Sequence, residues 1–205
     1  MPNHVQTVIR SDDEGAMKAF RKLMVDDDGD VDFNRVIPMP QELYDIYAGS
    51  CVIDGVRYSR WREIDDQRVP VSVEELLDLT DKYGVTFSND WGNEHWNTKW
   101  NAYDCYADDY VAEFSTAWAH PDPVIVEMSR KLPMYKFHVR YADENIGCNT
   151  GDYIILNGEI IFGFACLPEE SPAAWETALD IWGCQEYYVR QPDGTYQVKD
   201  TSLAA

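Results

Sequence analysis

The chain of 205 residues is long enough for one domain with an elaboration, and its 45% hydrophobic and 13% aromatic content argues against a globally disordered chain. The 37 acidic residues outnumber the 17 basic ones along the whole chain, which gives a formal net charge of -20. Such a surface repels phosphate groups, so the charge disfavours direct nucleic-acid binding and favours basic protein partners, solubility alone, or adaptation to high salt.

The cysteines and the N-terminus indicate where the protein acts. Five cysteines, an odd number with no CxxC pair, suggest reduced thiols in a cytosolic compartment. The first 15 residues lack the apolar segment of a signal peptide, and no apolar run reaches transmembrane length. We therefore expect a cytoplasmic protein without a membrane partner.

The first 84 residues predict two strands, a hairpin and two helices. Residues 4–9 are typical of a strand, and Ser11 with Glu14 has the spacing of a capping box that opens a helix. Residues 31–37 alternate like a half-buried strand, and Asp54-Gly55 predicts a hairpin. A second capping box predicts a helix over 72–83 that Gly84 ends.

The rest of the chain predicts mainly antiparallel strands. Residues 100–106 and 110–118 are expected to pair, and Asp122 with Pro123 opens a helix. Residues 135–141 alternate throughout, and Asn157-Gly158 predicts a hairpin beside them. A helix then follows Ser171-Pro172 and ends at Gly183, and residues 185–199 suggest a terminal hairpin.

This order predicts an α+β fold: a ferredoxin-like antiparallel sheet with helices on one face, an inserted helical segment and a C-terminal helix-hairpin extension. We expect the ferredoxin-like domain at 1–167, with the insertion at about 41–100, and the extension at 168–205.

Four segments resemble the YubB/Api92-like proteins of phages and plasmids. They are Pro2–Val5, Phe33–Pro40, Trp96–Asp104 and Phe114–Pro121. The resemblance covers residues 1–165, although the family's Trp-Cys-x-Asn start is missing here. It implies a ferredoxin-like domain and a mobile-element context, and it assigns no catalytic residue.

The Trp96–Asp104 motif is the most specific feature, and it has two interpretations. Lys99 among Trp96, Trp100 and Tyr103 could form an aromatic and cationic patch that binds a partner. Alternatively, the tryptophans anchor the inserted segment to the sheet, in which case Trp100 and Trp118 should be mostly buried.

No motif predicts a catalytic, metal or cofactor site. With Gly29 in the glycine position of an EF-hand, Met24 and Arg35 occupy the first and last ligand positions, which excludes that Ca²⁺ loop. HExxH, GxSxG, P-loop and GxGxxG patterns are missing. Glu94 and His95 could transfer protons in a cleft, but a surface loop is the simpler interpretation. We therefore expect no cofactor, and an enzyme is the less favoured interpretation.

The leading hypothesis is a non-catalytic acidic interaction protein of a phage or mobile element. Its acids would imitate DNA phosphates and occupy a basic groove of a host defence protein, as in anti-restriction or anti-CRISPR inhibition. The expected partner-binding residues are Asp26, Asp27, Asp28, Asp30, Asp108, Asp109, Trp96 and Lys99. The alternatives are an enzyme or small-ligand binder that uses a cleft above the sheet, and an accessory protein without a specific site.

Overall fold

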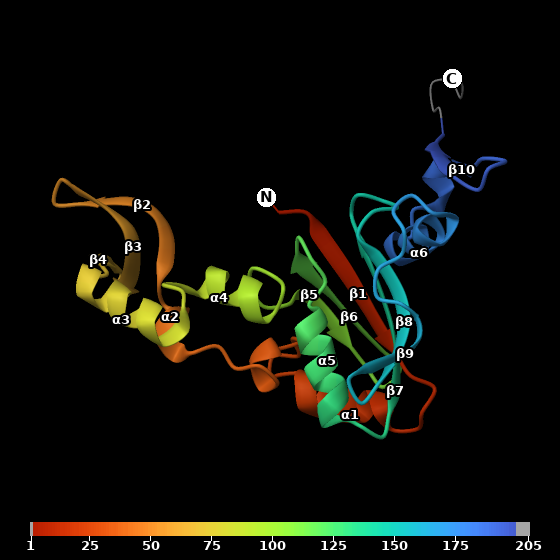
Figure 1. Cartoon of the computed structure of the whole chain (residues 1–205), viewed down its shortest axis with the longest axis horizontal. Coiled ribbons are helices and arrows are strands. Elements are labelled where there is room, and N and C mark those ends of the chain that lie inside the picture. Colours follow the sequence, from red (N-terminus) through yellow and green to blue (C-terminus); the bar gives the residue numbers. More distant parts are fainter. Residues whose placement is uncertain (1, 200–205) are drawn as a thin grey trace.

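A six-stranded antiparallel sheet organises the molecule (Figure 1). The computed structural model describes residues 2–199. The strands lie in the order β5-β6-β1-β7-β8-β9, with β1 central. In chain order, the first six elements that build this domain are β1 (His4–Arg10), α1 (Ala16–Met24), β5 (Tyr103–Ala107), β6 (Val111–Ala117), α5 (Asp122–Lys131) and β7 (Lys136–Asp143).

This βαββαβ order confirms the predicted ferredoxin-like α+β fold. β8 (Thr150–Leu156) and β9 (Glu159–Phe164) add two strands beyond β7. The alternating residues Phe137, Val139 and Tyr141 of β7 point into the core, as their period of two predicts. The hairpin through Asn157-Gly158 joins β8 to β9, also as predicted.

The insertion between α1 and β5 carries a second, smaller sheet. We call its three strands and the helix α3 the arm, because they extend away from the main sheet in Figure 1. The predicted hairpin and helix are confirmed there, and Ser72 Oγ accepts a 3.1 Å hydrogen bond from the Glu75 amide. The inserted elements are η1 (Phe33–Arg35), α2 (Gln41–Tyr44), β2 (Tyr47–Ile53), β3 (Val56–Ile64), β4 (Gln67–Pro70), α3 (Val73–Tyr83) and α4 (Ser88–His95).

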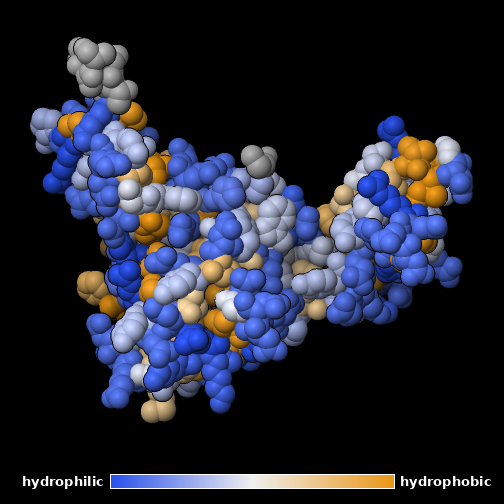
Figure 2. All heavy atoms as spheres, turned by 180° about the vertical axis from the view of Figure 1, so that it is seen from behind, coloured by the Kyte–Doolittle hydropathy of each residue, from blue (hydrophilic) through white to orange (hydrophobic). Residues whose placement is uncertain are grey.

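The C-terminal extension packs on the sheet face opposite α1 and α5. It contains α6 (Pro172–Trp182), η2 (Gln185–Tyr187), β10 (Tyr188–Arg190) and β11 (Tyr196–Val198). Arg140 of β7 points to the face opposite the core residues of that strand, and it pairs with Asp180 of α6 at 2.6 Å. Figure 2 shows a largely hydrophilic face that is hollowed between this extension and the arm. Within residues 2–199 no helix is long and apolar enough to cross a membrane.

Three predictions about individual elements are wrong. α1 begins at Ala16 rather than after Ser11, whose hydroxyl instead donates to the Lys136 carbonyl at 2.6 Å. Residues 31–37 do not form a strand, because the Asp32 carboxylate accepts from the Asn34 amide and starts a 3₁₀ turn. α5 begins with Asp122 inside the helix, so this residue is not its cap.

A chain of four aromatic rings joins the insertion to the main sheet. Phe114 of β6 meets Phe33 edge to face at 5.9 Å, and Phe33 meets Trp96 at 5.7 Å. Trp96 in turn meets Trp91 of α4 at 5.3 Å. Trp96 is 1% exposed, and its indole N–H donates to the Ile37 carbonyl at 2.9 Å. These contacts confirm that a tryptophan of the motif anchors the insertion.

The expectation that Trp100 and Trp118 are mostly buried is wrong. Trp100 is 36% exposed and Trp118 is 50% exposed. β6 ends at Ala117, and Trp118 adopts a left-handed conformation with φ of 68°, which breaks the alternation of the strand. Its ring consequently lies outside the core.

The two kinds of tryptophan should respond differently to truncation. We expect Trp96→Ala to lower the free energy of unfolding by about 3–5 kcal/mol, the range for large-to-small changes in a core. Trp100→Ala should cost about 1 kcal/mol or less, because its ring is partly solvated. Urea denaturation of both variants measures the difference, and equal costs would contradict the anchoring role of Trp96.

A buried histidine forms a polar network inside the core. His120 is 1% exposed, and its two ring nitrogens lie 3.0 Å from the Thr7 hydroxyl and 3.0 Å from the Tyr153 hydroxyl. Its ring stacks on Tyr141 at 4.1 Å. Burial lowers the pKa of His120 to about 3, so the ring is neutral in the folded protein at neutral pH.

Acid should therefore destabilise the fold through His120. Because its pKa is near 6.5 in an unfolded chain and about 3 in the folded one, the stabilisation is complete above pH 6.5 and is lost as the pH falls toward 3. Between pH 7 and pH 5 we expect the wild type to lose about 2 kcal/mol more than His120→Gln. Urea denaturation at each pH tests this. An unchanged pH dependence in His120→Gln would disprove the assignment.

Candidate functional site

The loop after α4 is held by the polar members of the Trp96–Asp104 motif. Thr98 Oγ donates to the Ala117 carbonyl at 2.9 Å, and Asn97 Nδ2 donates to the His120 carbonyl at 2.9 Å. Asn101 Nδ2 donates to Asp32 at 2.7 Å while its oxygen accepts from the Phe33 amide at 2.9 Å. The loop is thus fastened to β6, to the start of α5 and to η1, which places Lys99 and Trp100 at fixed positions.

Close packing of α4 adds to this attachment. A Cβ atom at Gly92 would lie 2.8 Å from the Thr98 carbonyl oxygen and 2.9 Å from that of Lys99. Only glycine therefore lets the helix approach the loop at this point.

Lys99 lies between two exposed tryptophans. Its Nζ is 5.0 Å from the centre of the Trp100 ring and 4.9 Å from that of Trp118, both within cation–π range. The sequence predicted a cationic and aromatic patch here, with Trp96 and Tyr103 as members. The structure supplies Trp118 in addition, whereas the ring of Trp96 is 1% exposed and is not part of the exposed patch.

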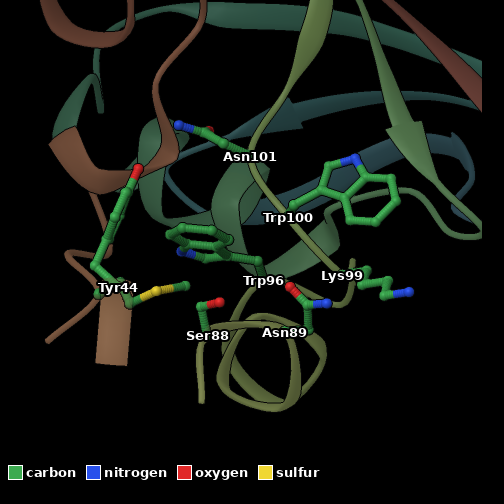
Figure 3. A pocket seen from close by; sticks show the side chains of 8 residues that line it. Tyr44, Ser88, Asn89, Trp96, Lys99, Trp100 and Asn101 are labelled. Carbon is green, nitrogen blue, oxygen red and sulfur yellow. The ribbon is translucent and has the colours of Figure 1, made fainter. Parts of the chain in front are cut away.

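A pocket of about 180 Å³ opens beside this patch (Figure 3). Trp96 forms its inner wall, and Lys99 and Trp100 lie on one side. Met39 and Tyr44 come from the segment before and within α2, and Ser88 and Asn89 from the first turn of α4. The remaining lining residue is Asn101. The pocket therefore lies where the insertion meets the main sheet, and it is not the predicted cleft above the sheet.

The acidic turn after α1 is exposed and internally ordered. Asp26 Oδ1 accepts from the amides of Asp28 and Asp30 at 3.0 and 2.9 Å. The side chains of Asp27, Asp28 and Asp30 are exposed, and none of them forms an ion pair within the described part of the chain. Burial and the nearby carboxylates of Asp30, Asp104 and Asp26 raise the pKa of the Cys105 thiol to about 11.

The second acidic pair differs from this turn. Asp108 accepts from the Tyr110 and Val111 amides at 2.7 and 2.8 Å, and these bonds lower its pKa and shape the turn between β5 and β6. Asp109 lies 2.7 Å from Arg21 and 3.7 Å from Lys18. Asp109 is therefore paired with basic side chains that α1 brings from a distant part of the sequence.

The other histidines outside the core contact neighbouring groups. His95 stacks on Trp91 at 4.1 Å and bonds the Trp91 carbonyl at 3.0 Å, and Glu94 and His95 are exposed, which agrees with the surface interpretation of this pair. His138 lies on the exposed face and pairs with Asp152 at 2.6 Å. Over residues 2–199, no group of three or more His, Cys, Asp or Glu side chains could hold a metal ion.

Sequence reasoning missed two features. One is Trp118 as the second ring around Lys99, which depends on a backbone reversal that the strand pattern does not signal. The other is the stack on the arm in which Trp61 lies 4.6 Å from the Tyr47 ring and 4.5 Å from the Arg68 guanidinium. The arginines and aromatic residues of 56–68 are a visible signal for the second feature.

The comparisons with known proteins agree with this fold. Residues 95–185 match a family model described as the ferredoxin-like domain in Api92-like protein. These residues include β5, β6, α5, β7, β8, β9 and α6, and the structure adds β1 and α1 to complete the βαββαβ unit. No curated protein and no solved structure has a significant match to the chain. Residues 95–185 are therefore similar to the ferredoxin-like domain in Api92-like protein.

Proposed function

We propose that the protein is a non-catalytic acidic interaction protein that binds a basic surface of a host protein. The observation that carries this proposal is the exposed, unpaired turn of Asp27, Asp28 and Asp30 on a chain with a net charge of -20. In the described residues, most basic side chains already contact a carboxylate or an aromatic ring. Long-range attraction would steer a basic groove toward this turn.

The order of the turn favours binding through charge. The Asp26 carboxylate holds the amides of Asp28 and Asp30, and Val25 forms an isolated bridge with Val31 across the base of the turn. The acids therefore need little additional ordering when they meet a partner, which lowers the entropy cost of association.

In the more specific form of this proposal, the acids imitate DNA phosphates. The target is then a host defence protein with a nucleic-acid groove, and inhibition is of the anti-restriction or anti-CRISPR kind in the host cytoplasm. The resemblance to proteins of phages and plasmids supports this context. Binding of a basic surface that does not hold DNA is the simpler form, and competition with DNA distinguishes the two.

A capture experiment tests the proposal. Immobilised protein is exposed to bacterial lysate at low salt, and bound proteins are eluted with duplex DNA, with neutral dextran, or with about 0.5 M salt, at which charge interactions are strongly screened. We expect salt to release the captured proteins and dextran to leave them bound. Release by duplex DNA supports mimicry.

Matched charge variants identify the surface. Asp27→Asn, Asp28→Asn and Asp30→Asn together should weaken capture and DNA-competitive binding. The control combines Asp54→Asn, Asp65→Asn and Asp66→Asn at turns of the arm, where positive φ angles of 50–61° suit asparagine. Both triple variants change the net charge equally. The proposal would be contradicted if high salt does not release the captured proteins and both triple variants still capture them.

A further inference from the structure

We propose that the pocket beside Lys99 binds a small aromatic carboxylate, with one ring inside the pocket and the carboxylate at its mouth. This site is separate from the acidic turn and does not depend on the proposed docking function. The inference rests on the size of the pocket, the nature of its walls and the charge around it.

The size of the pocket suits a single ring. Its volume is about 180 Å³. An engineered apolar cavity of about 150 Å³ in another protein accommodates benzene. A nucleoside, with a base and a sugar, exceeds this space, so the ligand is expected to enter with one ring and a short substituent.

The walls favour a flat and polarisable group. The indole rings of the partly exposed Trp100 and the buried Trp96 line the pocket, and Met39 supplies a thioether that adapts to a neighbouring ring. Trp96 is fixed by its hydrogen bond to Ile37 and by its two ring contacts, so this wall is already in place before a ligand enters.

The charge at the mouth favours an anion. No acidic residue lines the pocket, although the chain contains 37 of them. Lys99 forms no ion pair with another residue of the described chain, and its ammonium group is instead held between Trp100 and Trp118. In Figure 3 its side chain runs outward along the rim, away from Trp96. A carboxylate at the mouth would therefore meet this ammonium group while its ring lies against the tryptophans.

Two polar side chains can complete the recognition. Ser88 and Asn89 line the pocket and, among the hydrogen bonds of residues 2–199, their side chains have no partner. Asn101, by contrast, already uses both ends of its amide to hold Asp32 and Phe33. Ser88 and Asn89 are thus the lining groups that remain able to bond a ligand oxygen.

Titration with three probes tests the inference. Phenylacetate has the ring and the charge, phenylacetamide keeps the ring without the charge, and cyclohexylacetate keeps the charge without the flat ring. Indole N–H signals in ¹H–¹⁵N NMR spectra, assigned with Trp96→Phe and Trp100→Phe, report on the pocket. We expect phenylacetate to bind with a Kd on the order of 1 mM, as ligands of this size allow, and to shift both signals.

Substitutions then test the contributions of the Lys99 charge and of the pocket separately. Lys99→Gln should weaken phenylacetate binding about two- to fivefold, the range for an exposed ion pair, and leave phenylacetamide binding unchanged. Lys22→Gln removes the same charge from α1 and should have no effect. Ser88→Phe should fill the pocket and abolish binding of both aromatic probes while the rest of the spectrum shows a folded protein.

Three results would overturn the inference. They are equal affinity for phenylacetate and phenylacetamide, equal weakening by Lys99→Gln and Lys22→Gln, and probe-induced shifts that survive Ser88→Phe. The acidic-surface proposal is unaffected by any of them, because its variants lie on the turn after α1 and on the arm.

Discussion

The aromatic contact between Phe33 and Trp96 is the interaction on which the rest of the structure depends. Phe33 packs on Phe114 of the central sheet, and Trp96 packs on Trp91 of the insertion. A ferredoxin-like unit requires only a connection between α1 and β5, yet here that connection carries an entire arm. A long insertion with its own small sheet needs a buried attachment, because exposed contacts contribute little stability. The four rings supply it.

This attachment also determines what remains on the surface. The side chains of Thr98 and Asn101 form hydrogen bonds to β6 and η1, and the Trp96 ring is buried in the core. Lys99 and Trp100 have no such partners in the core, so they form the rim of a pocket. One motif therefore contributes both to the buried attachment and to the rim of the pocket, and its residues divide between the two interpretations of the sequence.

The sequence predicts structural features that depend on residues close together in the chain. It does not predict features that depend on contacts between residues far apart in the chain. Ser72 caps α3, Ser171 caps α6 and Asn157-Gly158 turns the hairpin because each acts within a few residues. The alternation at 31–37 misleads because Asp32 and the distant Asn101 hold the backbone in a 3₁₀ turn. Trp118 reaches Lys99 only through its left-handed backbone, and Asp109 meets Arg21 only after folding. The sequence motif thus located the candidate site, but it did not reveal which distant side chains contact its residues.

Native-state hydrogen exchange tests most directly whether the insertion and the sheet form one cooperative unit. The informative groups are the Phe33 amide, which bonds Asn101, the Ala117 amide, which bonds Thr98, and the indole N–H of Trp96. If the attachment holds as described, these three groups exchange only on global unfolding, with the same free energy as the amides of β1. Exchange of the Phe33 amide and the Trp96 indole through a much cheaper local opening, while β1 stays protected, would contradict the account.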